Sequence, residues 1–253
     1  MGFYDLSRTN REQLVTQINQ DIETDLLSGT TKTILVYFSD EDTYIRKTAY
    51  LAIGKLFYSN SKQQTKIHLT LQDLLNSKNE KIRQTTINAA GEIGKFHFNK
   101  VQHFFDIGLF DKHHSVRNAV IGSIKKMGEK NPEPVLTWAK PYLKHPDKEI
   151  RREICHGIEL RGRTHPQDIL PLLKILEFDS EKRVSNTLIH VIGQISYKNG
   201  CLKTVISHLN TWTNKALVEK ALDEIADVHE RYKKFAVLSQ AEVMAYIDKY
   251  FIR

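Results

Sequence analysis

The stretch DKHHSVRNAVIGSIKKM, at residues 111–127, decides the fold because its pattern occurs four more times in the chain. It consists of a turn, then Val or Ile, usually followed by Arg, and then apolar residues at helical spacing. The other copies occupy residues 40–56, 77–93, 145–161 and 179–195. The anchoring residues are 37, 34, 34 and 34 positions apart, and they are Ile45, Ile82, Val116, Ile150 and Val184. A register kept over so many copies indicates a repeat protein.

Inside each copy the apolar residues recur with a period of about 3.6, so each copy is predicted to form an amphipathic helix with one buried stripe. The copies align Gly54, Gly91 and Gly193 at one position, which indicates close packing between helices there. Paired helices in tandem units of this length predict an α-solenoid, in which each pair packs on the next. The first helix of each pair is predicted before each copy, over residues 31–38, 64–75, 101–110, 134–143 and 166–176.

The prolines and the turns narrow the type of repeat. Pro134 and Pro166 suit the first turn of a helix, whereas Pro141 and Pro171 lie inside one and should bend it. Bent first helices, an aspartate in the turn and Val/Ile-Arg at the start of the second helix together resemble the HEAT repeat over residues 31–197. The resemblance implies an all-α fold, a right-handed HEAT-like α-solenoid of about six helix pairs.

We expect a single domain over residues 1–253. Residues 1–30 should form an N-terminal cap, residues 31–200 the five clear repeats, and residues 201–253 a divergent repeat with a C-terminal cap. Terminal units must solvate one face, so the sequence pattern is expected to diverge there.

Composition excludes several classes of protein. The 253 residues carry 37 Lys and Arg against 30 Asp and Glu, a net charge of +7, and contain only two cysteines. A disulfide scaffold and an all-cysteine zinc site are therefore excluded. The eleven histidines show no firm metal-ligand spacing, so no metal and no cofactor are predicted. No signal peptide and no apolar run of about 18 residues is visible, so we expect a cytoplasmic monomer without a membrane partner.

The excess positive charge lies in the third and fourth repeats, because residues 112–163 contain twelve Lys and Arg against six Asp and Glu. The arginines that follow the repeat anchors are predicted to be structural and to bond the turns, and they are Arg46, Arg83, Arg117 and Arg151. Side chains opposite the buried stripes should line the concave face of the array. They are Gln84, Asn88, Glu92 and Lys95 in the second repeat, Asn118, Lys125, Lys126 and Glu129 in the third, Arg152, His156, Glu159 and Arg163 in the fourth, and Asn186, His190, Gln194 and Tyr197 in the fifth.

Two kinds of partner fit this polar face. Lys and Arg would neutralise the phosphates of a nucleic-acid backbone, while Asn and Gln would hydrogen-bond them without any sequence preference. An acidic protein segment would fit the same residues.

The stretch IRREICHGIELRGRTHP, at residues 150–166, is similar to a pattern of the bacterial HEAT-like alkylpurine DNA glycosylase (DNA alkylation repair) family. In that family Val-Arg-Arg opens a helix, and His-Pro or Asn-Pro begins the next unit. The resemblance implies DNA in the concave groove, where a carboxylate and nearby tryptophans act on the damaged nucleotide. Two departures affect that chemistry. Tyr142 stands four residues after Trp138 where one branch has Asp, and His156 stands where another branch has Glu.

From these observations we predict a DNA-binding HEAT-repeat protein of the DNA alkylation repair type that holds the phosphate backbone on a basic concave face. Base excision is left open, and an active glycosylase would use Glu159 or Glu92 as its carboxylate, because N-glycosidic cleavage builds positive charge on the sugar. The alternative is a scaffold for an acidic protein partner. The predicted DNA contacts are Lys95, Asn118, Lys126, Arg152, His156, Arg163 and Asn186.

Overall fold

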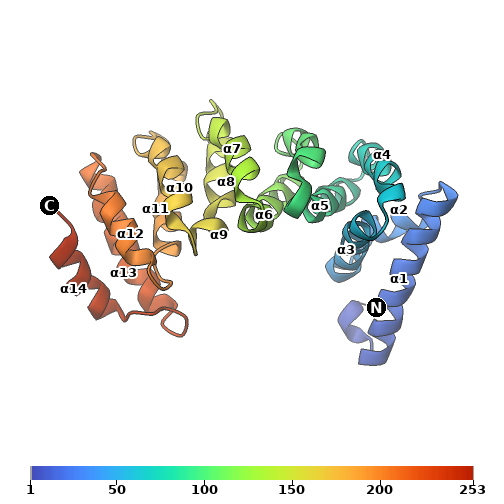
Figure 1. Cartoon of the computed structure of the whole chain (residues 1–253), viewed down its shortest axis with the longest axis horizontal. Helices are drawn as coiled ribbons and strands as arrows, with labels where there is room; N and C mark the ends of the chain where they lie inside the picture. The colour runs from blue at the N-terminus through green and yellow to red at the C-terminus, as the bar shows by residue number, and fades with distance from the viewer. Residues whose placement is uncertain (1, 253) are drawn as a thin grey trace. The chain divides into compact units, whose positions relative to one another are not determined.

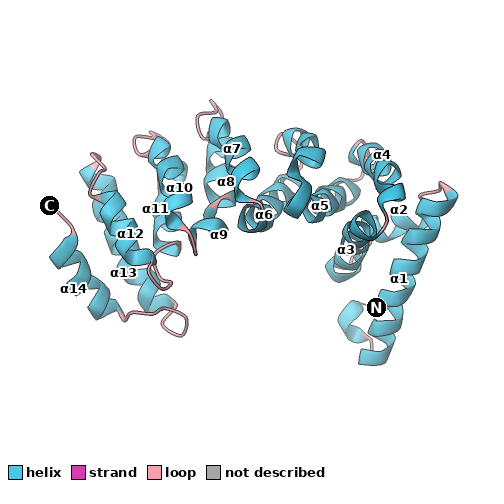
Figure 2. Ribbon diagram, in the orientation of Figure 1, coloured by secondary structure: helices cyan, strands magenta, loops and turns pink. Residues whose placement is uncertain are grey.

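The computed structural model describes residues 2–252, and every regular element in this range is a helix (Figure 2). The prediction of an all-α fold built from helix pairs is therefore confirmed. None of the described helices is both long and apolar enough to cross a bilayer. The chain divides into two compact units, residues 1–123 and 124–253, and each is described separately below.

The first unit stacks helix pairs (Figure 1). Its helices are the 3-10 turns η1 (Phe3–Asp5) and η2 (Ser61–Gln63) and the α-helices α1 (Arg8–Ser28), α2 (Lys32–Ser39), α3 (Thr43–Ser59), α4 (Gln64–Leu75) and α5 (Glu80–Gly108). Helix α3 packs against both α1 and α5, while α2 and α4 pack against α3 and α5. Because His97 has non-helical φ and ψ angles of −132° and 52°, α5 consists of two helical segments joined at a kink.

The second unit repeats this arrangement. Its helices are α7 (Pro132–Tyr142), α8 (Lys148–Gly157), α9 (Glu159–Gly162), α10 (Pro166–Leu173), η3 (Lys174–Leu176), α11 (Lys182–Gln194), α12 (Cys201–Leu209), α13 (Lys215–Arg231) and α14 (Gln240–Tyr250). The division between the two units falls within α6 (His114–Lys130). Helix α11 packs against both α8 and α13, α10 packs against α9 and α12, and α14 packs against α12 and α13 (Figure 1).

The helices that carry the repeat anchors, α3, α5, α6, α8 and α11, are called the anchor helices below. Several begin at a side-chain cap supplied by the turn before them. Asp42, Asn79 and Asp147 accept hydrogen bonds from the backbone N–H of Tyr44, Lys81 and Glu149 at 2.7, 2.9 and 2.8 Å. Each cap satisfies an N–H group that has no partner inside its helix. The turn residues of the repeat therefore fix where α3, α5 and α8 start.

The predicted buried stripe of the third copy is confirmed, because Val116, Val120, Ile124 and Met127 have no exposed surface. The aligned glycines are also explained by close packing. A Cβ atom added at Gly54 or Gly91 would lie 2.8 Å from Glu92 Cβ or 2.7 Å from Ser123 Cβ. Glycine therefore lets each anchor helix approach the next more closely than any other residue would.

Most of the helices that the sequence predicts are present near their predicted bounds. Helix α4 has the predicted bounds, Pro134 lies in the first turn of α7, and Pro141 and Pro171 lie inside α7 and α10. The fourth copy was predicted as one helix, which is wrong. It ends as α8 at Gly157 and resumes as the short α9 after Ile158. Glycine is a weak helix former, and the break falls directly after it.

The four arginines after the anchors are structural, as predicted. Arg83 donates from Nε and Nη2 to the carboxylate of Asp111 at 2.7 and 3.0 Å, and from Nη1 to the Ser77 carbonyl at 2.8 Å. Arg151 repeats this geometry with Asp179 and the carbonyl of His145. The turn carbonyls of Asp40 and Asp111 accept from the other two, Arg46 and Arg117. Arg83 and Arg151 therefore join consecutive turns, whereas the bonds of Arg46 and Arg117 to Asp40 and Asp111 hold the turns that precede their own helices.

Candidate functional site

A buried carboxylate organises the polar side chains of the second unit. We call this group the Glu159 cluster, and it consists of Lys125, His156, Glu159, Arg163 and Gln194. Lys125 Nζ and His156 Nε2 lie 3.3 and 3.2 Å from Glu159 Oε2. Arg163 donates to Glu159 Oε1 from Nε at 2.9 Å and also from Nη2, which reaches the Gln194 side-chain oxygen at 2.9 Å. Only 2% of the Glu159 side chain is exposed.

Several helices supply the Glu159 cluster. Lys125 comes from α6, His156 from α8 and Gln194 from α11. Glu159 is the first residue of α9, directly after the break at Ile158, and Arg163 is its C-cap. Side chains three and four residues apart lie on the same side of a helix, so the order His156, Glu159, Arg163 places a carboxylate between two basic groups.

The charges in the cluster keep Glu159 ionised. Burial raises the pKa of Glu159, but the hydrogen bond from His156 and the charges of Lys125 and Arg163 outweigh burial and lower that pKa to about 2. An isolated buried carboxylate would instead be neutral. Lys125 and Arg163 thus stabilise the charged form of Glu159 in a buried position, and the Glu159 carboxylate in turn fixes the positions of these cations.

His156 Nε2 is shared between two partners. It lies 2.9 Å from Lys125 Nζ as well as 3.2 Å from Glu159 Oε2. An imidazole without a proton on Nε2 accepts a hydrogen bond from Lys125 at this nitrogen, whereas one with a proton on Nε2 donates to Glu159. With one carboxylate against Lys125 and Arg163, the cluster carries an excess positive charge in both states.

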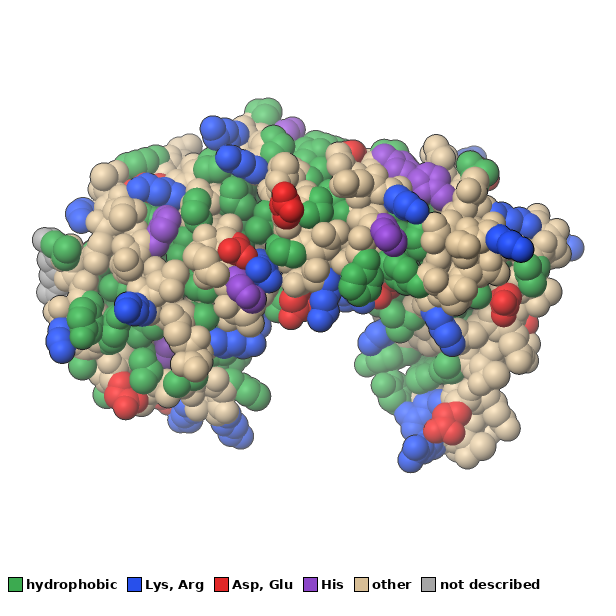
Figure 3. Space-filling view, in the orientation of Figure 1, with side chains coloured by type: hydrophobic (Ala, Val, Ile, Leu, Met, Phe, Trp, Pro, Cys, Tyr) green, Lys and Arg blue, Asp and Glu red, His purple; other side chains and the backbone are tan. Residues whose placement is uncertain are grey.

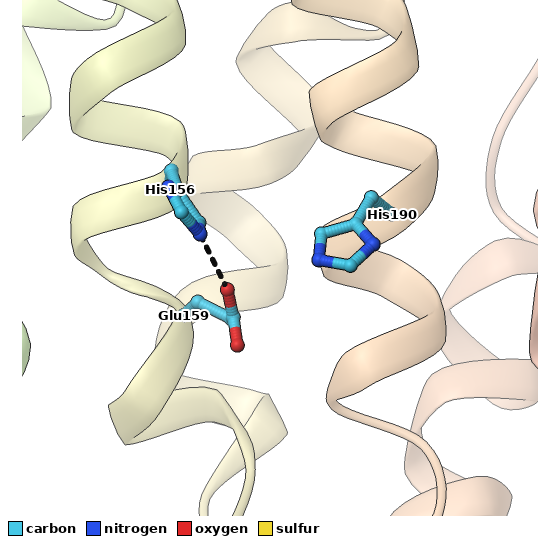
Figure 4. A group of neighbouring side chains, drawn as sticks. All are labelled: His156, Glu159 and His190. Atoms are coloured by element: carbon cyan, nitrogen blue, oxygen red, sulfur yellow. Dashed lines mark ion pairs between the residues drawn. The ribbon is translucent and has the colours of Figure 1, made fainter. Parts of the chain in front are cut away.

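Three of the neighbouring side chains meet a geometric requirement of a metal site. His156, Glu159 and His190 place potential ligand atoms within 4.8 Å of one another, and His190 faces the other two from α11 (Figure 4). The Lys125 ammonium group, however, already contacts both His156 and Glu159, and Arg163 occupies the other carboxylate oxygen. A metal ion would have to displace these cations, so we interpret the three residues as part of the charge network.

A second charge network surrounds Glu149 on α8. Arg152 Nε lies 2.8 Å and Arg183 Nη1 2.7 Å from the Glu149 carboxylate. Arg152 also lies 3.5 Å from the buried Glu153. On the face of the molecule that Figure 3 shows, basic and acidic side chains are interspersed in the same way. The Glu149 network sets two carboxylates against two arginines, whereas in the Glu159 cluster one carboxylate serves Lys125, His156 and Arg163.

The structure separates the predicted site residues into groups. His156 and Arg163 meet at Glu159, while Arg152 belongs to the Glu149 network. Lys95 is in the first unit and pairs with Glu92 one helical turn away. The two asparagines, Asn118 and Asn186, are exposed, and Lys126 is half-buried.

Four residues that were expected on the exposed face are buried, and Gln194, which is only 1% exposed, is one of them. Glu92 and Glu159 were placed on the exposed face, but their side chains are only 9% and 2% exposed, because basic groups hold both of them against the protein. Tyr197 was also expected there, yet it is buried and stacks on Tyr232 with ring centroids 5.4 Å apart. Helix α11 ends at Gln194, so a helical projection does not apply to Tyr197.

The predicted DNA contacts did not include Lys125 and Gln194, which the structure adds as functional candidates. The sequence placed both on the polar face but did not distinguish them from its other members. The useful signal was the spacing of His156, Glu159 and Arg163, which predicts neighbouring charges on one helix face. Their partners come from other repeats, and the structure was needed to identify them.

Comparisons with known proteins agree with the repeat architecture. The family model for Cnd1, the non-SMC mitotic condensation complex subunit 1, matches residues 22–114. No curated protein matches the chain. Among solved structures, an archaeal HEAT-like repeats protein from Thermococcus onnurineus NA1 is 16% identical with a TM-score of 0.40, covering 88% of this chain and 98% of that one.

Two further structures are similar at the same level. An engineered protein is 13% identical with a TM-score of 0.36, covering 82% of this chain and 97% of that one. The complex of CpcE and CpcF of phycocyanin lyase from Nostoc sp. gives 14% identity and a TM-score of 0.34, covering 88% of this chain and 95% of that one. The tandem helix pairs and the repeated turn arginines define the fold as an α-solenoid of HEAT-like repeats, and the Cnd1 match covers less than half of the chain.

Proposed function

We propose that this HEAT-like repeat protein binds the phosphate backbone of DNA through the exposed side of the anchor helices in its second unit, without excising bases. The Glu159 cluster is the observation that carries the proposal. One buried carboxylate holds Lys125, Arg163 and a histidine, so positive charge is in excess there. The side chains of Lys125 and Arg163 keep 24% and 28% of their surface exposed, which leaves them accessible to an anion.

The buried carboxylate also prepares these cations for binding. A free Lys or Arg side chain loses conformational entropy when it binds a ligand, and here that loss has already occurred on folding. Arg163 uses Nε and Nη2 for its contacts with Glu159 and Gln194, which leaves Nη1 without a partner among the described residues. Phosphate oxygens are suitable acceptors for such a group.

The likeness of residues 150–166 to the DNA alkylation repair family favours DNA over an acidic protein segment, because these residues include Arg152, His156, Glu159 and Arg163. The same geometry argues against excision. A catalytic carboxylate must face the positive charge that develops on the sugar, but the charge of Glu159 is already compensated on both oxygens. Glu92 is likewise engaged by Lys95.

Fluorescence anisotropy with a labelled duplex tests the proposal. The variant Lys125→Gln/Glu159→Gln/Arg163→Gln removes both cations without leaving a buried charge unpaired. We expect it to bind at least about tenfold more weakly than the wild type, by a similar factor on unrelated sequences, because phosphate contacts carry no sequence information.

A matched control is Lys140→Ala on α7, which removes an exposed positive charge from outside the anchor helices and should leave the affinity unchanged. Equal affinities for the wild type and the triple variant would overturn the proposal. So would binding of an acidic peptide at micromolar protein when no duplex binds.

A further inference from the structure

The second unit also contains a pocket of about 160 Å³ that shares no residue with the Glu159 cluster. It lies between the loop that follows α11, helices α12 and α13, and the loop that precedes α14. Leu202, Val237 and Leu238 supply apolar walls, and the lining includes no Asp or Glu. The pocket is therefore mainly apolar, and it is unsuited to a cation.

Two buried polar side chains belong to this lining, Ser196 and His229, and only 1% of the His229 surface is exposed. Its Nδ1 lies 2.8 Å from the Ile225 carbonyl oxygen on the same helix. A carbonyl can only accept, so Nδ1 carries the proton and Nε2 carries a lone pair. Burial lowers the pKa of His229, more than the hydrogen bond to Ile225 raises it, which keeps the ring neutral at neutral pH.

The Nε2 acceptor has no partner among the described residues, although the atom is not sealed from solvent. Because Nδ1 faces the backbone of α13, the opposite edge of the ring is the one that borders the pocket. A ligand that fills the pocket displaces water from this acceptor, so it leaves Nε2 without a hydrogen bond unless it donates one itself. Lys198 and Lys203 also line the pocket, but an anion placed against Nε2 would set a lone pair against a lone pair, so the group that meets Nε2 must be a donor.

We propose that this pocket binds a phenol-type group, a compact apolar ring whose single O–H donates to His229 Nε2. The volume suits such a ring, because an apolar cavity of about 150 Å³ in another protein holds benzene. The group could be a free phenol or the tyrosine side chain of a protein partner, which present the same chemistry. This inference does not depend on DNA binding, so either can fail alone.

Titration of the full chain with p-cresol and with toluene, followed by NMR chemical shifts, tests the proposal. The two probes have similar apolar bodies and differ in the hydroxyl group. We expect p-cresol to bind about tenfold more tightly than toluene, which corresponds to one buried hydrogen bond. The variant His229→Phe keeps a ring of similar shape but removes the acceptor, so it should bind both probes equally.

Leu202→Trp should fill the pocket and weaken the binding of both probes, and circular dichroism would check that both variants fold. Equal affinities of the two probes for the wild type, or a preference for p-cresol that survives in His229→Phe, would overturn the proposal. A short peptide with a central tyrosine distinguishes the two sources. Tighter binding of the peptide than of p-cresol indicates a protein partner, and weaker binding indicates a free phenol.

Discussion

Arg151 and Arg163 are twelve residues apart, yet their environments give them different functions. Arg151 is bonded to Asp179 and to the turn carbonyls, so its charge is used within the fold. Arg161 is similar, because it pairs with Asp168 at 2.7 Å. Arg163 shares one carboxylate with Lys125 and His156 and contributes to an excess of positive charge. The net charge of +7 therefore overstates the charge available to a ligand.

Glu159 gives a prediction at this scale, because its pKa is lowered from 4.5 to about 2 in the folded protein. A carboxylate with a depressed pKa stabilises the fold above its unfolded pKa, and the stabilisation is lost as the pH falls toward the folded value. Between pH 5 and pH 3, Glu159 should thus lose about 2 kcal/mol of its contribution to the free energy of unfolding.

Urea unfolding of the wild type and of Glu159→Gln at both pH values measures this loss. The wild type should be the more stable of the two at pH 5, and its advantage should shrink by about 2 kcal/mol at pH 3. Glu219→Gln on α13 is a suitable control, because Glu219 is exposed and should show no such change. An advantage that does not vary with pH would mean that Glu159 is not held ionised by its neighbours.

At the scale of the helix, the apolar period and the turn residues predicted most of the elements. Helix α4 was predicted to the residue, because a clear amphipathic pattern ends at a polar turn. The break between α8 and α9 was not, since Ile158 continues the apolar pattern across it. Gln194 could not be assigned to the Glu159 cluster for a related reason. Its partner Arg163 lies 31 residues away, and a helical projection carries no information about contacts between repeats.

The aligned glycines give a prediction for the packing of the helices. A Cβ added at Gly193 would lie 2.6 Å from Glu224 Cγ, 3.0 Å from Val228 Cγ2 and 3.2 Å from the Glu224 carbonyl oxygen. Gly193→Ala should therefore push α11 away from α13 and destabilise the protein by about 1–3 kcal/mol.

Gly122 on α6 is the matched control, because nothing lies within 4 Å of a Cβ added there. Gly122→Ala should stabilise the protein by about 0.5–1 kcal/mol, since alanine favours a helix over glycine. Thermal unfolding of both variants measures the difference. Equal stabilities would show that the close approach at Gly193 is not a constraint on the packing.

At the scale of the whole molecule, the family match and the proposed site lie in different units. The Cnd1 match, at residues 22–114, lies in the first unit, whereas the Glu159 cluster, on which the proposed DNA binding rests, lies in the second. Most of the Lys and Arg residues that are proposed to contact DNA also lie in the second unit. If the second unit binds DNA as proposed, the salt dependence of binding should be set by the cations of that unit.

The salt dependence of DNA binding tests this assignment on the intact chain. The phosphate contacts proposed in the second unit are the cations Lys125, Lys126, Arg152 and Arg163. If each neutralises one phosphate, the plot of log K against log salt should have a slope of about −3 to −4, and affinity should fall about a hundredfold between 50 and 200 mM salt. The triple variant at Lys125, Glu159 and Arg163 should reduce the steepness by about two. A slope that the triple variant does not change would place the phosphate contacts elsewhere in the molecule, even if the affinity itself were high.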